Sequence, residues 1–166
     1  MTGTLIVLIS CLFMNGGAGR VISTLDSDNS PNLIVMNTVI ASGTSGLVML
    51  LSNQYQNILR KEQMIQKTGL SSQHSVSGVC KAIISGMVSV TACCNNISLY
   101  SACIVGFIGC VLYSTLSKVF KRYEIDDPLE NSQAHGACGM WSLIASGLFD
   151  IQKGFLMTGN PNFFII

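Results

Sequence analysis

The ionisable residue best suited to a chemical role in this chain is a histidine within an apolar stretch. His135 lies in the run DDPLENSQAHGACGMW, which covers residues 126–141. In a membrane helix such a side chain is costly, so it indicates a functional site. On a helix, Asn131, His135 and Gly139 share one face because they are four residues apart. This face is the first candidate for chemistry in the chain.

Imidazole is suited to hydrogen bonding or proton transfer because it can donate, accept or pass a proton. Its pKa in water is about 6.5, and burial favours the neutral form. We expect a neutral His135 in a narrow apolar path to bond a small uncharged molecule and to offer no stable site to a hydrated cation. The alternative is a histidine that bonds a neighbouring helix for packing alone.

Composition decides what kind of environment surrounds this histidine. Charged residues make up 10% of the 166 residues and hydrophobic ones 49%, and the mean hydropathy is +0.51. A soluble domain is about 25% charged, so the chain is expected to be an integral, multi-pass membrane protein with the lipid bilayer as its partner. A net charge of +1 gives no reason to expect nucleic acid.

Five apolar stretches predict an all-α membrane fold with five transmembrane helices. Each is near the ~20 residues that a helix needs to cross a bilayer. The predicted spans are residues 3–22, 33–53, 76–97, 99–118 and 133–149. A secretory signal peptide is the alternative for the first stretch, although it lacks the usual positively charged start.

The lysines and arginines predict the orientation of these spans. With a cytoplasmic N-terminus, the inner connections hold six basic residues: Arg60, Lys61, Lys67, Lys118, Lys121 and Arg122. The outer connections hold only Arg20 and Lys153. Such an excess is typical of cytoplasmic loops. The C-terminus is then expected outside.

Small residues at spacing four predict close helix packing. Ala102, Gly106 and Cys110 form one such row, and Ser42 and Gly46 form another. Small side chains let helix backbones approach closely in lipid. The alternative is that glycine here reflects ordinary membrane-helix composition. The seven cysteines lack zinc-type spacing and are expected to be core residues.

The remaining charged residues near the spans have simpler expected roles. Asp126 and Asp127 precede Pro128 and are expected to cap the last helix. Lys81 lies about a turn and a half into the third span and is expected to extend its ammonium to the cytoplasmic surface. No nucleophile–base pair, metal-ligand set or phosphate loop stands out, so no enzyme activity, metal or cofactor is expected.

These motifs resemble the ammonium transporter, methylammonium permease and Rhesus family, and especially its eukaryotic ammonium transporters. The strongest resemblance is the DDPLE…QxHGxCGxW run at 126–141, followed by GLF at 147–149. FMNGG at 13–17 resembles the family's F-N-x-G segment, and NT at 37–38 and VTACC at 90–94 resemble stretches of its second half.

The resemblance implies an eleven-helix fold in which spans one to five and six to ten form an inverted repeat. Inverted repeats place the substrate path at their interface. Residues 1–166 then form a partial ammonium transporter domain, holding spans six to ten only. The implied partners are ammonium or ammonia and either a homotrimer or a complementary chain supplying the first repeat. A plasma-membrane location is expected, with an organelle membrane as the alternative.

The resemblance also implies roles for particular residues. His135 matches the second histidine of a twin-histidine pore through which ammonia passes after ammonium loses its proton. The other positions implied near this path are Val7, Cys11, Met14, Ile84 and Asn131, with Asn15, Asp126, Asp127 and Lys81 as structural residues beside it. Met14 stands where the family has a gating phenylalanine, and Lys81 stands at a position that is usually uncharged.

Ammonium or ammonia transport through a partial transporter is therefore the leading functional prediction. The alternative is a non-conducting structural membrane subunit, or a remnant, built from the same helices. The partner histidine is expected in the fifth span, which this sequence does not supply, and Lys81 also favours the alternative.

Overall fold

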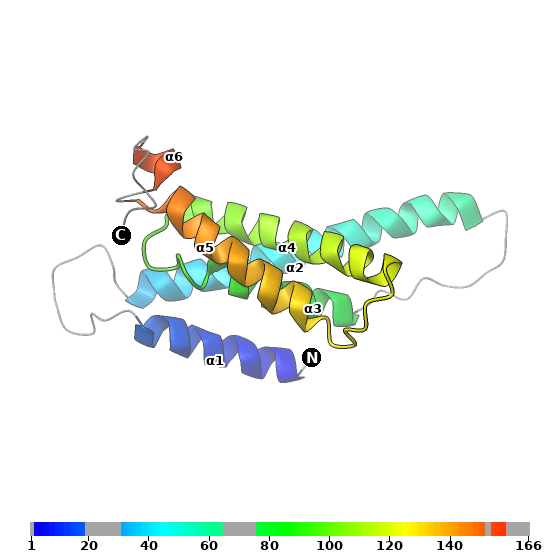
Figure 1. Ribbon diagram of the computed structural model, residues 1–166, viewed down its shortest axis with the longest axis horizontal. Coiled ribbons are helices and arrows are strands. Elements are labelled where there is room, and N and C mark those ends of the chain that lie inside the picture. The colour runs from blue at the N-terminus through cyan, green and yellow to red at the C-terminus, as the bar shows by residue number, and fades with distance from the viewer. Residues whose placement is uncertain (1, 19–30, 65–75, 152–153, 159–166) are drawn as a thin grey trace.

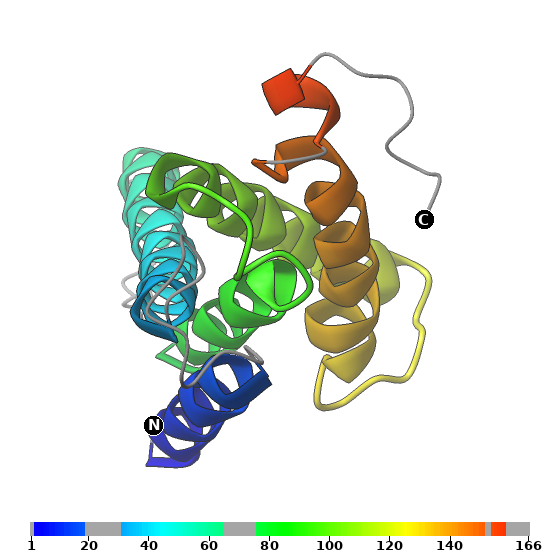
Figure 2. The ribbon, with the colours of Figure 1, turned by 90° about the vertical axis from the view of Figure 1, so that its left-hand side faces the viewer.

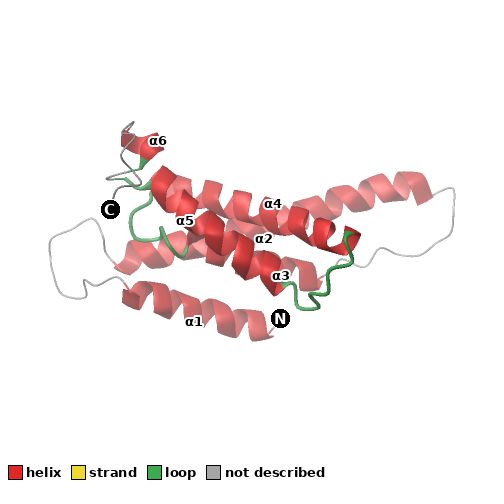
Figure 3. Cartoon of the chain, viewed as in Figure 1, coloured by secondary structure: helices red, strands yellow, loops and turns green. Residues whose placement is uncertain are grey.

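The computed structural model describes residues 2–18, 31–64, 76–151 and 154–158. Across these residues the regular elements are all helices (Figure 3). They are α1 (Thr2–Ala18), α2 (Pro31–Met64), α3 (Val76–Val90), α4 (Leu99–Arg122), the π-helix η1 (Ser132–Ala137), α5 (Cys138–Phe149) and α6 (Phe155–Thr158). Of the residues used to predict orientation, Arg20, Lys67 and Lys153 lie outside the described residues, as do the side chains of Arg60 and Lys61.

The long helices lie side by side, and the C-terminal part of α2 projects beyond the rest (Figure 1). Helices α2, α3 and α4 pack on one another and form the centre of the bundle. Helix α1 packs on α2 and α3, whereas η1 and α5 pack on α3 and α4 (Figure 2). Helix α3 therefore separates α1 from α5, and no described residue of α1 contacts α5.

Each predicted span overlaps a helix, and the largest differences in length are those of α2 and α3. Helix α2 continues to Met64 because the sequence after position 53 is rich in Gln, Leu, Arg, Lys and Glu, which favour helix even where they are polar. Helix α3 ends at Val90 and is followed by turns up to Asn96. Asn37 stabilises this irregular stretch, since its Nδ2 donates to the carbonyl oxygens of Cys94 and Ile97, both at 2.9 Å.

Two of the described helices are long and apolar enough to cross a membrane. These segments are Pro31–Gln56, with a mean hydropathy of 1.7, and Leu99–Arg122, with a mean hydropathy of 1.8. Thr2–Gly17 and Val76–Val90 are apolar but shorter. The count of five spans and their numbering as six to ten remain predictions.

The central helices approach closely through glycine, as the small-residue rows predict. A Cβ on Gly106 would clash with Ala41 and Thr44 of α2, and a Cβ on Gly86 would clash with Ala41 and Ser45. A Cβ on Gly109 of α4 would likewise clash with Ser89 of α3. Close backbone contact is the packing expected between helices in lipid.

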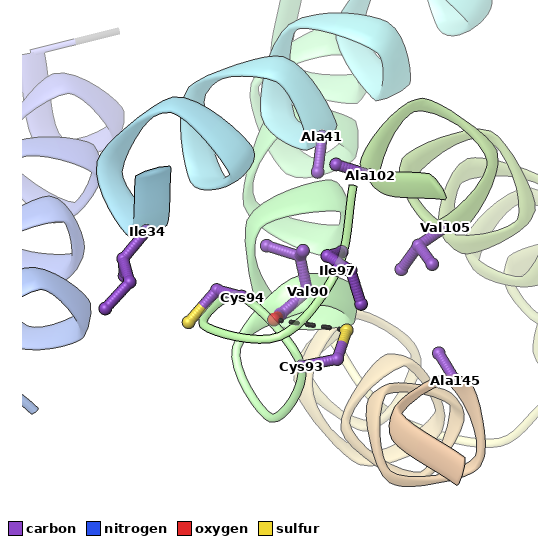
Figure 4. Packing of buried hydrophobic residues seen from close by; sticks show 9 residues of the cluster. All are labelled: Ile34, Ala41, Val90, Cys93, Cys94, Ile97, Ala102, Val105 and Ala145. Carbon is purple, nitrogen blue, oxygen red and sulfur yellow. Dashed lines mark hydrogen bonds between the residues drawn. The ribbon is translucent and has the colours of Figure 1, made fainter. Parts of the chain in front are cut away.

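Small and sulfur-containing side chains fill the core between these helices. Figure 4 shows one cluster, in which residues of α2, α4 and α5 converge on the turn after α3. Its members are Ile34, Ala41, Val90, Cys93, Cys94, Ile97, Ala102, Val105 and Ala145. All seven cysteines are free thiols, and Cys93, Cys94, Cys110 and Cys138 are buried. The expected core role is thus observed for these four.

Candidate functional site

The helix that carries His135 begins after a loop whose carboxylate Asp127 caps it. Oδ1 and Oδ2 of Asp127 accept hydrogen bonds from the backbone N–H groups of Asn131 at 3.2 Å and Ser132 at 2.9 Å. The side-chain amide of Gln133 donates to Asp127 Oδ2 at 3.0 Å and to the carbonyl of Glu130 at 2.8 Å. The backbone N–H of Ser132, followed by that of Asn131, lowers the pKa of Asp127.

Asp126, the other carboxylate expected at this cap, behaves differently. It is exposed and makes no hydrogen bond to another described residue. Capping is therefore observed for Asp127 alone. The two oxygens of Asp127 accept two of the N–H groups that the first turn leaves without an intrahelical partner.

Glu130, in the same loop, is the centre of a charged cluster. Its Oε2 lies 3.1 Å from Nζ of Lys81, and its Oε1 lies 3.3 Å from Nζ of Lys121. The hydroxyl groups of Tyr113 and Ser117 also donate to the carboxylate. The cluster thus connects α3, α4 and the loop before η1.

The cluster holds Glu130 in an uncommon backbone conformation and keeps it ionised. Its φ angle is 56°, in the left-handed region that non-glycine residues rarely occupy. Partial burial by itself raises the pKa of the carboxyl. The hydrogen bond from Tyr113 and the ammonium groups of Lys81 and Lys121 outweigh burial and lower the pKa to about 2.

The Lys81 ammonium is partly exposed and is paired. Its side chain is 28% exposed and pairs with Glu130, whose side chain is 15% exposed. Its extension toward the cytoplasmic surface stays a prediction, and the structure adds a counter-ion from the loop before η1. Sequence reasoning missed Glu130, Tyr113, Ser117 and Lys121 as members of this cluster. The available signal was the lysine itself, since a lysine in an apolar helix needs a counter-ion.

His135 and Asn131 both lie on the surface at the start of the last helix pair. Asn131 precedes η1 and His135 lies within it, and both side chains are exposed. Among the described residues, none forms a hydrogen bond to the His135 imidazole. Their neighbours Gln133 and Ala134 are buried. The imidazole therefore faces away from this chain's own core.

The expected alignment of Asn131, His135 and Gly139 on one α-helical face changes in the structure. Residues Ser132–Ala137 form a π-helix, whose wider turn carries i→i+5 hydrogen bonds. Residues four apart then fall short of a full turn. Gly139 is half-buried and faces Val88 of α3, whereas the other two are exposed. Single π-helical turns are frequent at functional sites.

The α1 residues expected near the path lie across α3 from His135. Val7 is 37% exposed and Met14 56% exposed, and Cys11 is half-buried. Ile84 lies on α3, the helix between α1 and α5, and is half-buried (Figure 2). The structure therefore arranges these positions on three neighbouring helices and brings none of the α1 residues into contact with α5.

Asn15 joins α1 to α2 by a buried hydrogen bond. Its side chain is buried, and its Nδ2 donates to Oγ1 of Thr38 at 3.2 Å. The Thr38 hydroxyl in turn donates to the carbonyl of Ile34 at 2.9 Å. This chain of hydrogen bonds fixes α1 against α2.

A bundle with apolar helices, glycine-mediated packing and an ion pair between helix and loop is typical of a polytopic membrane protein. Comparison with known sequences then gives the family. The sequence model of the Ammonium Transporter Family matches residues 1–165, and the chain belongs to this family of membrane transporters and channels.

Curated plant proteins share part of the sequence. "Ammonium transporter 1 member 1" of Solanum lycopersicum is 35% identical over 80 residues, which is 48% of this chain and 16% of that protein. "Ammonium transporter 1 member 3" of the same species is 28% identical over 123 residues, which is 74% of this chain and 24% of that protein. The chain therefore spans less than a quarter of the length of these relatives.

Two solved structures share the fold at low sequence identity. The crystal structure of the Mep2 mutant delta442 from Candida albicans superposes with a TM-score of 0.75 at 20% identity, covering 95% of this chain and 38% of that one. Saccharomyces cerevisiae Mep2 gives a TM-score of 0.70, also at 20% identity, covering 89% of this chain and 30% of that one. The helices therefore have the arrangement found in part of these two Mep2 structures.

Proposed function

We propose that this chain forms one side of an ammonia-conducting path, as the second five-helix repeat of an ammonium transporter. The observation that carries the proposal is the exposed imidazole of His135, which forms no hydrogen bond with any described residue. A polar ring facing lipid would be costly, so the membrane environment requires a protein or water-filled partner surface beside it. A complementary repeat would supply that surface.

The apolar surface around His135 also supports a missing protein neighbour. Met140, Leu143 and Ile144 of α5 are 65%, 67% and 51% exposed. In a complete inverted repeat, such faces would lie against the other half or against lipid. Val7, Cys11, Met14, Ile84 and Asn131 would then line or border the path with His135. A homotrimer and a plasma-membrane location are proposed with this function.

Lys81 is less of an obstacle to this function than its position suggests. An unpaired cation beside the path would repel ammonium at short range. In the structure, the Glu130 carboxylate lies 3.1 Å from the Lys81 ammonium and offsets part of its charge, although Lys121 shares the same carboxylate. Lys81 is therefore not an isolated positive charge beside the path. Among the described residues, no comparable contact makes up for the gating phenylalanine that Met14 replaces. We propose that Met14 itself narrows the path.

The experiment is an uptake assay on the protein in its native membrane assembly. Cells lacking other ammonium uptake would express the wild type, His135→Ala, or the control Ile104→Ala, at a 47% exposed position of α4 outside the proposed path. We expect His135→Ala to alter methylammonium uptake or its selectivity over potassium, while Ile104→Ala does not. Unchanged uptake and selectivity in His135→Ala, at equal membrane abundance, would refute a pore role for this histidine.

The second candidate is a non-conducting structural subunit built from the same helices. It is favoured by the open apolar faces of α1 and α5, which suit assembly whether or not the assembly conducts. Purification of the chain from its native membrane distinguishes the two functions. Association with a protein that bears the complementary repeat and confers uptake supports the transporter. A stable complex without uptake supports the structural subunit.

A further inference from the structure

A polar pocket lies beside the Glu130 cluster, where α2, α3, α4 and the loop before η1 meet. Its volume is about 240 Å³. The residues that matter for its chemistry are Lys81, Lys118, Lys121 and Glu130, together with Ser52 and Asn53 of α2. The pocket is at the end of the bundle from which α2 projects (Figure 1). None of the residues implied for the transport path, other than Lys81, lines it.

The pocket carries an excess of positive charge. Three lysines and one glutamate line it, so two positive charges remain after Glu130 is counted. Lys81 and Lys121 share that carboxylate. Lys118 has no ion-pair partner among the described residues. Uncompensated like charges in a recess repel one another, and a bound anion would relieve this repulsion.

The uncharged lining also favours an anion with several oxygen atoms. Hydroxyl and amide groups from α2, α3 and α4 surround the lysines. Those of Tyr113 and Ser117 already donate to Glu130, whereas Ser52 and Asn53 of α2 can donate to a ligand. A phosphate group accepts bonds from several directions at once, and lysine acts toward it as a point charge. A planar carboxylate ligand would reach fewer of these donors because its two oxygens lie on one side.

We propose that this pocket binds a phosphate group. The phosphate group can come from two sources, the headgroup of an anionic lipid or a free phosphate ion. The pocket lies near the end of the apolar part of α2, Pro31–Gln56, and near the C-terminal end of α4, the depth at which lipid headgroups meet a membrane helix. The proposal does not depend on whether His135 lines a transport path.

The test uses the full chain purified in its membrane assembly, with two probes. Inorganic phosphate is titrated into the detergent-solubilised protein by calorimetry. Nanodiscs of phosphatidylcholine, with or without phosphatidylinositol phosphate, are analysed for lipid retained per chain by native mass spectrometry. The variants are Lys118→Gln combined with Lys121→Gln, both at exposed positions, and the control Arg122→Gln, which is the next residue of α4 and does not line the pocket.

We expect at least one probe to bind at a single site per chain. The lysine double variant should weaken this binding at least about tenfold, since each lost contact is a charge-assisted hydrogen bond. Arg122→Gln should leave it within about twofold, as for other exposed charges. Lipid retention that inorganic phosphate does not displace identifies a headgroup, and saturable binding of inorganic phosphate alone identifies the free ion. Absence of binding by both probes, or equal losses in the double variant and Arg122→Gln, would overturn the proposal.

Discussion

Lys81 of α3 and Glu130 of the loop before η1 form an ion pair with an Nζ–Oε2 distance of 3.1 Å. The lysine stands in an apolar helix, and the glutamate has a left-handed backbone conformation. A lysine in an apolar helix and a non-glycine residue with a left-handed backbone are each locally unfavourable. The ion pair gives each charged group an opposite charge. The pair, with Tyr113, joins two helices to the loop that starts the His135 helix. Its integrity should therefore matter to both stability and the geometry of that helix.

Removing the charge of Glu130 should destabilise the protein. Glu130→Gln leaves the partly buried Lys81 without a counter-ion, and we expect a loss of about 1–3 kcal/mol in the free energy of unfolding. Denaturant unfolding in detergent, followed by tryptophan fluorescence, measures this. The control is Lys121→Gln, whose side chain is 73% exposed and should cost at most about 1 kcal/mol. Equal losses in the two variants would contradict a special role for the Lys81 pair.

The same cluster predicts an acid-dependent loss of stability. The pKa of Glu130 is lowered from an ordinary value of 4.5 to about 2 in the folded protein. A lowered pKa stabilises the fold fully above the unfolded value, and this stabilisation is lost as the pH falls through the folded value. We expect the melting temperature to decrease between pH 4.5 and about 2. Glu130→Gln should flatten this part of the pH profile, and an unchanged slope in the variant would contradict the assignment.

The close approach of α2 and α4 at Gly106 is sensitive to a single methyl group. In Gly106→Ala the new Cβ would clash with the backbone of Ala41 and with the side chain of Thr44. Overpacking of this kind costs about 1–3 kcal/mol, which thermal unfolding would detect. Gly43→Ala is the matched control, because its Cβ would meet nothing within 4 Å. Equal melting temperatures in the two variants would contradict the tight helix contact at Gly106.

Asp127 should matter more than its neighbour Asp126, although both are adjacent carboxylates before Pro128. Asp127→Asn weakens the charged cap at the N–H groups of Asn131 and Ser132, so the melting temperature should fall. Asp126→Asn removes an exposed charge with no hydrogen bond to a described residue, so the melting temperature should stay unchanged. Differential scanning calorimetry on the two variants decides this. A larger effect from Asp126→Asn would require a different start for the helix.

Local sequence patterns predicted the parts of the fold that depend on local physics. The apolar stretches indicated the helices because each helix satisfies its own backbone hydrogen bonds in a membrane. The glycine and serine rows around Gly106 and Ser42 indicated close packing, which depends only on side-chain size at helical spacing.

Helix ends were less predictable because they depend on partners elsewhere. The third span was expected to reach residue 97, but α3 ends at Val90. Asn37 of α2 satisfies two carbonyl groups in the turn that follows. Apolar residues in this turn looked like a continuing helix because no local breaker lies before Asn95. The hydrogen bonds from Asn37 of α2 replace backbone hydrogen bonds that a longer α3 would have made.

The sequence by itself determined that this is a helical membrane-type chain, and the resemblance of its motifs indicated the family to which it belongs. Both follow from residue types and their spacing, which need no knowledge of distant contacts. Only the tertiary structure decided that Lys81 pairs with Glu130, that Asp127 caps the last helix without Asp126, and that His135 faces outward from a π-helical turn. These features depend on where a loop returns relative to another helix, and the free energy of an ion pair or a cap is set by distances that one-dimensional spacing does not contain.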